Sequence, residues 1–145
     1  MEAASKGARE AGAGVVGVTA EVYFARGRKP NAYLSRELQV KSAVDRLMEL
    51  IDLSDASIAI GISPGTILEI ITVWEYIIKR FIEPRPIILI GREWRELGLF
   101  FDAHEHVRHH RDTFYYATTP HDAVTILEER FGKQERLPEL NVISD

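Results

Sequence analysis

The sequence predicts an α/β fold with a mostly parallel sheet, on the basis of two observations. The first is a set of short, nearly continuous apolar runs at residues 15–18, 57–62, 86–91 and 114–117. Such runs, without polar and apolar alternation, are typical of strands that are covered on both faces. The second is that a segment with helical character separates each run from the next, as in crossover connections between parallel strands. Together they indicate a Rossmann-like, three-layer arrangement.

The first third of the chain is expected to form two helices around the first strand. Residues 2–11 are rich in good helix formers, and glycines then favour a stop before the strand at 15–18. From Thr19 to Leu34 we expect a long irregular loop, because glycine, proline and asparagine interrupt it. Apolar residues then recur at helical spacing, which predicts an amphipathic helix from about Ser35 to Leu53.

The remaining elements alternate strand and helix. A helix is expected to follow the strand at 57–62 and to run to about Ile82, and a short helix is expected over residues 93–102. The last helix, residues 120–131, opens with a proline and with the capping-box pair Thr119 and Asp122.

The composition bounds the class of protein. The chain has 145 residues, a formal net charge of −4 at pH 7 and no cysteine. The negative charge disfavours a general nucleic-acid binder, and the lack of cysteine excludes disulfides and thiolate chemistry. No apolar run is long and uncharged enough to span a bilayer, and the N-terminus lacks the apolar core of a signal peptide. We expect one domain at residues 1–132, a tail at 133–145, a cytoplasmic location and neither a nucleic-acid nor a membrane partner.

One loop stands where α/β sheets place their ligands. The segment 61–69 joins a predicted strand to a helix, and ligands in such sheets lie beyond the carboxyl ends of the strands. A helix N-terminus presents backbone N–H groups that can hold a phosphate, with Gly65 allowing a close approach and Thr66 adding a hydroxyl. Glu69 would place a carboxylate about one turn into the helix. A carboxylate beside an anion pocket suggests chemistry on a group attached to the anion.

The residues that stand out also have simpler explanations. The spacing of Thr66 and Glu69 is that of a capping box, in which the two side chains only satisfy backbone donors. Arg46 lies off the apolar stripe of its predicted helix, and an arginine on a polar face is usually solvated surface. Spacing alone leaves a catalytic and a purely structural role open for each.

Several residues match one known family at the family's own spacing. Gly65, Thr66 and Glu69 follow the strand in the pattern G-T-x-x-E. Arg46 stands on an earlier helix at the family's distance before the glutamate, and the segment 85–89 extends the match. On these residues the chain resembles the Lonely Guy family of cytokinin-activating phosphoribohydrolases, long mislabelled as possible lysine decarboxylases, and its bacterial Rossmann-type relatives. The family's motifs are P-G-G-x-G-T-x-x-E and E-R-K.

The resemblance also concerns the N-terminus and the phosphate loop. Residues 1–4 resemble a family segment that directly follows a glycine-rich nucleotide-binding loop, so the chain is expected to lack that loop and the β-α-β portion before it. Where the family has Pro-Gly-Gly, this chain has Gly61, Ile62 and Ser63. Two side chains therefore stand where bare backbone would approach a phosphate.

The resemblance implies hydrolysis of the N-glycosidic bond of a nucleoside 5′-monophosphate, giving free base and ribose 5-phosphate. It implies Glu69 as the carboxylate that stabilises an oxocarbenium-like transition state or activates water, and Arg46 as the residue that holds the substrate or the glutamate. The residues implied in phosphate and nucleotide binding are Met1, Ser63, Gly65 and Thr66. The family uses no metal or redox cofactor for this step. The alternative is a non-catalytic Rossmann-like module that binds nucleotides or dimerises, with a degraded phosphate loop.

Three further features bear on partners and ligands. Apolar residues cover most of the circumference of the predicted helix 65–82, more than one sheet face covers, which predicts a homodimer through this helix; the family is likewise dimeric. Four histidines have spacings that can bind zinc or nickel, but they match no fixed metal template, and a solvated connection is favoured. They are His104, His106, His109 and His110. For the basic run Arg26, Arg28 and Lys29, a solvated loop is favoured over steering of an anionic substrate.

Overall fold

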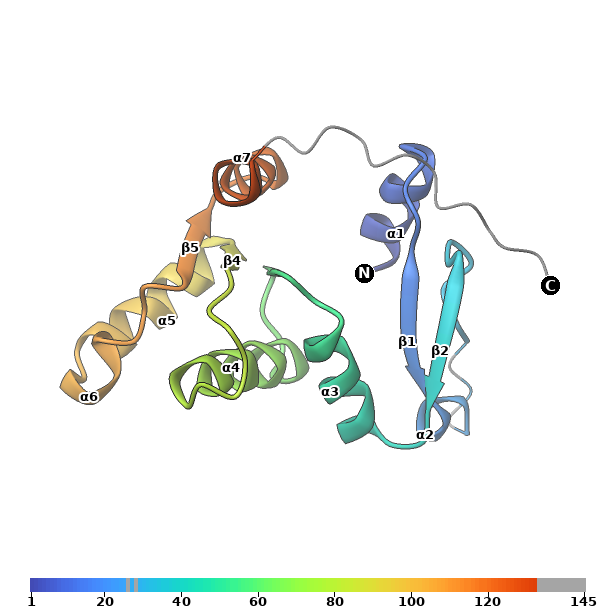
Figure 1. The fold of residues 1–145 in the computed structure, drawn as a ribbon, viewed down its shortest axis with the longest axis horizontal. Coiled ribbons are helices and arrows are strands. Elements are labelled where there is room, and N and C mark those ends of the chain that lie inside the picture. The colour runs from blue at the N-terminus through green and yellow to red at the C-terminus, as the bar shows by residue number, and fades with distance from the viewer. Residues whose placement is uncertain (26, 28, 133–145) are drawn as a thin grey trace. The chain divides into compact units, whose positions relative to one another are not determined.

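The structure is a computed structural model that describes residues 1–25, 27 and 29–132. It consists of two compact units, Met1–Ser54 and Asp55–Asp145. Both are built from parallel strands and helices (Figure 1), so the predicted α/β class with Rossmann-like character is confirmed. The single domain expected at residues 1–132 stays a prediction, and the tail at 133–145 lies outside the described residues.

The first unit contains one parallel strand pair. Its elements in order are α1 (Glu2–Glu10), β1 (Val16–Ala20), α2 (Glu21–Phe24), β2 (Arg36–Val40) and α3 (Ala43–Asp52). The strands β1 and β2 pair in parallel, from Val16 opposite Arg36 to Ala20 opposite Val40. Among the described residues of this unit, the buried apolar ones are Val18 and Ala20 of β1 and Ile51 of α3.

The predicted helix from Ser35 to Leu53 is wrong in its first part. Residues 36–40 form β2, in which Leu38 and Val40 are half-buried while Glu37 and Gln39 are exposed, an alternation typical of a strand. The helix begins only at Ala43. The predicted loop from Thr19 to Leu34 is also too long, because β1 runs to Ala20 and the short helix α2 follows it directly.

Capping boxes fix the starts of α3 and α7, and both involve an aspartate. Asp45 accepts bonds from the Ser42 hydroxyl (2.7 Å) and the Ser42 N–H (3.0 Å), and Asp122 accepts bonds from the N–H groups of Thr119 (2.8 Å) and Thr118 (3.0 Å). These bonds lower the pKa of both carboxyl groups. Because the ionised form is favoured in the folded state, the caps stabilise the fold above the unfolded pKa. Their contribution is lost as the pH falls through the folded pKa.

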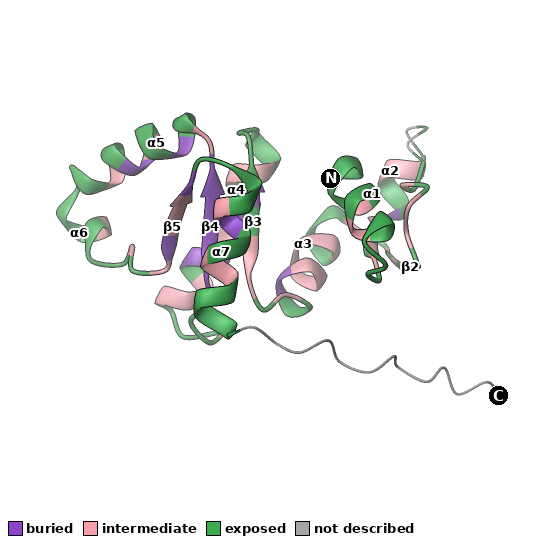
Figure 2. Ribbon diagram, turned by 90° about the horizontal axis from the view of Figure 1, so that it is seen from above, coloured by how far each residue is buried: buried purple, intermediate pink, exposed green. Residues whose placement is uncertain are grey.

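The second unit is a three-stranded parallel sheet with helices around it. Its elements are β3 (Ser57–Ile60), α4 (Pro64–Ile78), β4 (Ile87–Ile90), α5 (Arg92–Asp102), α6 (Glu105–Arg108), β5 (Phe114–Ala117) and α7 (Pro120–Phe131). The strand order is β3-β4-β5, and all pairs are parallel. Every residue of the central strand β4 is buried (Figure 2).

Both faces of β4 are covered. Ile88 and Ile90 pack against Ala117 of β5 and Ala123 of α7. Ile87 and Leu89 point to the opposite face, because successive strand residues alternate, and they are 0% and 1% exposed. Burial on two faces explains why these strands read as continuous apolar runs.

Most predicted elements of the second unit are confirmed. The four-residue strands lie within or at the predicted ranges, and α7 spans the predicted residues and begins with the predicted capping box. Helix α4 ends at Ile78, four residues earlier than expected, and Arg80 has a φ of 58° just beyond its end. The short helix α6 has no counterpart among the predicted elements. Among the described residues, no helix is long and apolar enough to cross a bilayer.

Gly98 of α5 makes room for a polar network around Arg111. Arg111 pairs with Asp102, donates to the Gly98 carbonyl (2.6 Å) and donates to the hydroxyl of Tyr116. A Cβ added at Gly98 would collide with Arg111 and Tyr116. Burial raises the pKa of Tyr116, so its hydroxyl stays protonated at neutral pH.

We therefore expect Gly98→Ala to lower the free energy of unfolding by about 1–3 kcal/mol, as overpacking does elsewhere. Urea denaturation followed by circular dichroism measures this. Gly7→Ala is the matched control, because Gly7 also lies within a helix but a Cβ added there would have no neighbouring atom within 4 Å. A Gly98→Ala variant with the same free energy of unfolding as the parent would show that Arg111 and Tyr116 can move away from the added methyl group without loss of stability.

Candidate functional site

The loop after β3 turns sharply into helix α4. Gly61 has a φ of 67°, in the left-handed region that favours glycine. The indole N–H of Trp94, from α5, donates to the Gly61 carbonyl at 3.0 Å, and Trp94 is only 2% exposed. The turn that precedes the helix is therefore held by a buried side chain of a different element.

Helix α4 begins at Pro64, with Ser63 as its N-cap. The Ser63 hydroxyl accepts the Thr66 N–H at 3.1 Å and is bonded to the Thr66 hydroxyl at 2.8 Å. Thr66 thus lies inside the first turn and is not the N-cap, so the alternative in which Thr66 and Glu69 form a capping box is wrong. Glu69 lies one turn further along the helix and is half-buried.

This helix start offers few free backbone donors. Pro64 has no N–H, the Thr66 N–H bonds to the Ser63 hydroxyl, and the Ile67 N–H bonds to the Ser63 carbonyl at 2.9 Å. Within the described part of the chain, Gly65 has the one N–H of this turn for which no such bond is found. The Ser63 side chain therefore occupies a donor that would otherwise be open to an anion.

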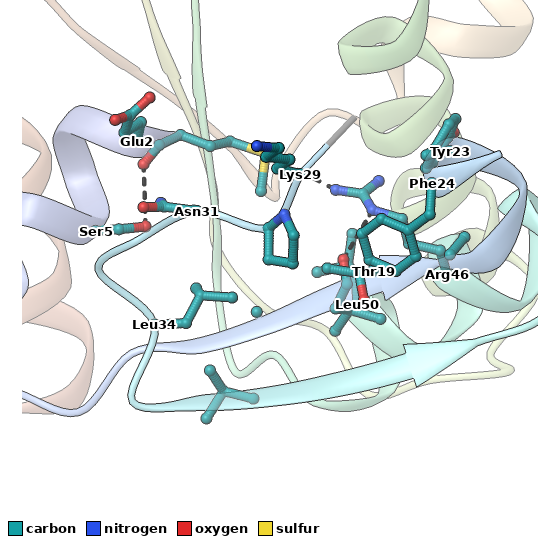
Figure 3. Close-up of a pocket in the computed structure, with 16 residues that line it drawn as sticks. Glu2, Ser5, Thr19, Tyr23, Phe24, Lys29, Asn31, Leu34, Arg46 and Leu50 are labelled. Atoms are coloured by element: carbon teal, nitrogen blue, oxygen red, sulfur yellow. Dashed lines mark hydrogen bonds between the residues drawn. The ribbon is translucent and has the colours of Figure 1, made fainter. Parts of the chain in front are cut away.

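A pocket of about 240 Å³ lies in the first unit (Figure 3). Its walls come from α1, β1, α2, α3 and the loop before β2. Tyr23 and Phe24 of α2 line it together with Leu34 and Leu50. It therefore combines aromatic and aliphatic walls with a few polar side chains, the usual composition of a small-molecule site.

Arg46 reaches this pocket from α3. Its Nε donates to the carbonyl of Val18 at 3.0 Å, and its terminal nitrogen lies 3.8 Å from the sulfur of Met1. The side chain is half-buried and lines the pocket together with Met1 and Lys29. The alternative in which Arg46 is merely solvated surface does not fit these contacts.

The predicted site residues fall into two groups. Met1 and Arg46 come together in the first unit, whereas Ser63, Gly65, Thr66 and Glu69 lie together at the start of α4 in the second. That these two groups of residues act on the same substrate stays a prediction.

Several lining residues of the pocket are not among the predicted site residues. Tyr23, Phe24 and Asn31 fall in the segment expected to be an irregular loop, and Lys29 stands out in the sequence only for its charge. The aromatic pair beside a basic run is the one signal that could have pointed to them. Arg26 and Arg28 lie outside the described residues.

The four histidines of residues 104–110 are exposed. The Nδ1 atom of His104 lies 2.8 Å from the Phe100 carbonyl, and its ring packs on the Phe100 ring at 4.6 Å between centroids. The carbonyl of His110 accepts the indole N–H of Trp74. In the residues that the structure describes, no group of three or more histidine, cysteine or acidic side chains could hold a metal ion.

Comparisons with known proteins identify relatives at the level of family and fold. A family model described as "Possible lysine decarboxylase" matches residues 1–128. No curated protein sequence matches the chain. Two similar solved structures are a molybdenum cofactor binding protein from the phototrophic bacterium Rippkaea orientalis, with a TM-score of 0.68 and 19% identity, and the molybdenum cofactor carrier protein of Chlamydomonas reinhardtii, with a TM-score of 0.60 and 18% identity. Each alignment covers 90% of this chain, and they cover 71% and 70% of those chains. At these identities the likeness concerns the fold.

Proposed function

The chain belongs to the possible lysine decarboxylase family, the Lonely Guy family of the sequence resemblance, and from that premise we propose that it binds a nucleoside 5′-monophosphate and hydrolyses its N-glycosidic bond. The observation that carries the proposal is the position of Glu69. Glu69 lies about one turn into α4, on the C-terminal side of Ser63, Gly65 and Thr66. This helix start follows the carboxyl end of β3. Parallel sheets bind ligands at this end of their strands.

The proposed reaction breaks the bond between C1′ of the ribose and the nitrogen of the base. The electron pair leaves with the base, positive charge develops on the ribose ring, the oxygen of a water molecule bonds to C1′, and a proton from that water ends on the nitrogen of the released base. The carboxylate of Glu69 stabilises the cationic transition state or takes the proton from that water. Arg46 and Met1 line the pocket of the first unit and are proposed to bind a ligand there.

The test is a product assay with the full chain and AMP, read by liquid chromatography. The proposal expects adenine and ribose 5-phosphate in equal amounts, at a rate proportional to the protein concentration. AMP that remains intact after long incubation at high protein concentration would contradict the hydrolase proposal.

A second candidate is a binding or carrier protein without turnover. The start of α4 favours this second candidate. The Ser63 hydroxyl already accepts the Thr66 N–H, which leaves the Gly65 N–H of this turn to bind an anion. The two similar structures are also cofactor binding and carrier proteins. This candidate predicts saturable ligand binding with no release of base.

We also propose that the protein acts in the cytoplasm as a homodimer that packs through α4. Leu68 on α4 and Phe81 just beyond the end of this helix are large apolar side chains that are 58% and 69% exposed. A second copy of the chain would cover them.

For the dimer, we expect sedimentation equilibrium at micromolar concentration to give twice the chain mass. Leu68→Arg should shift the mass toward the monomer, because it would bury a charge in the interface. Val124→Arg on α7 is the matched control, since Val124 is also an exposed apolar residue, at 48%. A parent protein that is monomeric at this concentration would contradict the dimer.

A further inference from the structure

A second hollow lies at the amino end of the sheet in the second unit. Its volume is about 700 Å³, and its described lining residues all belong to this unit. They come from the last turn of α4, from the loop between α4 and β4, and from the segment between α6 and β5. We call it the amino-end pocket, because its lining segments lead directly into β4 and β5.

Part of the lining of the amino-end pocket is aliphatic. Ile77 and Ile78 of α4 and Ile82 of the following loop line it and are half-buried, and Pro84 joins them. A ligand that removes the remaining surface of such side chains from water gains free energy. At about 700 Å³, the pocket lies within the range of about 300–1,000 Å³ that encloses whole small ligands. This part of the lining therefore suits the apolar body of a ligand.

The charged part of the lining favours a cation. Glu83 and Asp112 bring two negative charges, against one positive charge from Arg80. Among the described residues, no ion pair or hydrogen bond engages either carboxylate, so both are available to a ligand. His109 and His110 add imidazole nitrogens that can accept a hydrogen bond from an ammonium group. Because α4 ends here, the partial negative charge of its C-terminus adds to the same preference.

Two backbone features hold the pocket in shape before a ligand arrives. Arg80 has a φ of 58°, in the left-handed region that residues with a side chain rarely adopt. The Phe81 N–H bonds to the Tyr76 carbonyl at 2.9 Å, which fixes this turn to the end of α4. In the segment before β5, the His110 carbonyl accepts the indole N–H of Trp74. Backbone held in a rarely populated conformation is common at ligand sites, and a preformed pocket costs a ligand less ordering.

From this lining we propose that the amino-end pocket is a second binding site, for an organic cation in which a protonated amine is attached to an apolar body. The amine lies against Glu83 and Asp112, and the apolar body lies against the isoleucines of α4 and the following loop. The inference does not rest on the proposed function. Neither Glu69 nor a nucleotide takes part in it, because the start of α4 lies at the carboxyl end of the parallel strands and this pocket lies at their amino end.

Two probes of nearly the same shape test the preference for a cation. They are 4-phenylbutylamine, which is protonated at about pH 8, and 4-phenylbutanol, which is neutral. Their dissociation constants are measured by titration calorimetry on the full chain. We expect saturable binding of the amine and about tenfold weaker binding of the alcohol, because a charge-assisted hydrogen bond is lost. The double variant Glu83→Gln with Asp112→Asn should weaken the amine about tenfold and leave the alcohol unchanged.

Arg80→Gln should have the opposite effect. It removes a positive charge from the lining, so the amine should bind about threefold more tightly while the alcohol stays unchanged. Weaker binding of the amine by this variant would contradict a cation site. Glu128→Gln is the matched control, because Glu128 is an exposed carboxylate of α7 that does not line the pocket. This control should bind both probes like the parent, and circular dichroism establishes that each variant is folded.

Three results would overturn the proposed site. The first is an absence of saturable binding of 4-phenylbutylamine up to about 5 mM, and the second is equal affinity for the amine and the alcohol. The third is amine binding that the double variant leaves unchanged, or that Glu128→Gln weakens equally, which would indicate attraction to the net negative charge of the chain. Binding that depends on Glu83 and Asp112 but not on Glu128 supports the site, whether or not AMP is hydrolysed.

Discussion

Glu69→Gln is expected to lower the rate of adenine release from AMP by at least about 100-fold, the usual contribution of a positioned acid or base. Glutamine keeps the size of the side chain but carries no negative charge, so it can neither stabilise a cationic sugar ring nor accept a proton. Because Glu69 lies within α4 and the N-cap of this helix is Ser63, the substitution leaves the helix start intact. Binding of AMP should change less than turnover, since the carboxylate acts mainly in the transition state.

Glu75→Gln is the matched control for this experiment. Glu75 is on the same helix, is exposed and forms a surface ion pair with Lys79 at 3.8 Å, so its replacement should leave the rate unchanged. Both variants are assayed by chromatography beside the parent. A Glu69→Gln protein that releases adenine as fast as the parent would exclude Glu69 from the chemistry.

Trp94→Ala is expected to lower the free energy of unfolding by about 3–5 kcal/mol, as truncation of a buried aromatic side chain usually does. Trp94 is among the largest fully buried side chains of the described residues. Its loss would leave a cavity and would also free the Gly61 carbonyl, which accepts the indole N–H at the turn before α4. Urea denaturation measures the change.

Trp94→Phe separates packing from hydrogen bonding at this position. Phenylalanine fills much of the space but has no N–H to donate, so it should lose about 1–3 kcal/mol by leaving the Gly61 carbonyl without its donor. If this turn positions the candidate site, Trp94→Phe should also raise the dissociation constant of AMP while the protein remains folded. Parent-like stability of both Trp94 variants would contradict a role for this side chain in holding the turn.

The strands of the second unit could be predicted because their environment leaves a simple pattern. β4 is buried on both faces, so its residues are all apolar, and β5 and α7 occupy the ranges that the sequence indicates. β2 could not be recognised in the same way. Its short polar and apolar alternation joins a true amphipathic helix, and the combined segment mimics one long helix.

The candidate site was predictable only in part, for a different reason. The G-T-x-x-E motif is contiguous, so the place of Gly65, Thr66 and Glu69 at the start of a helix could be predicted from the sequence, while their role stays a prediction. The N-cap is Ser63 and not Thr66, because Pro64 occupies the first position of the helix. The pocket of the first unit gathers side chains from four elements and a loop. Residues that come together from separate elements in this way share no fixed spacing in the sequence, so no spacing pattern could reveal them.

Nucleotide binding is tested most directly by titration calorimetry of the full chain with AMP, without reference to turnover. We expect saturable binding at one site per chain, weakened about tenfold or more in Arg46→Ala, because a charged hydrogen-bonding partner of the ligand is lost. An absence of saturable binding at AMP concentrations of about 5 mM, above the usual range of KM values, would contradict it.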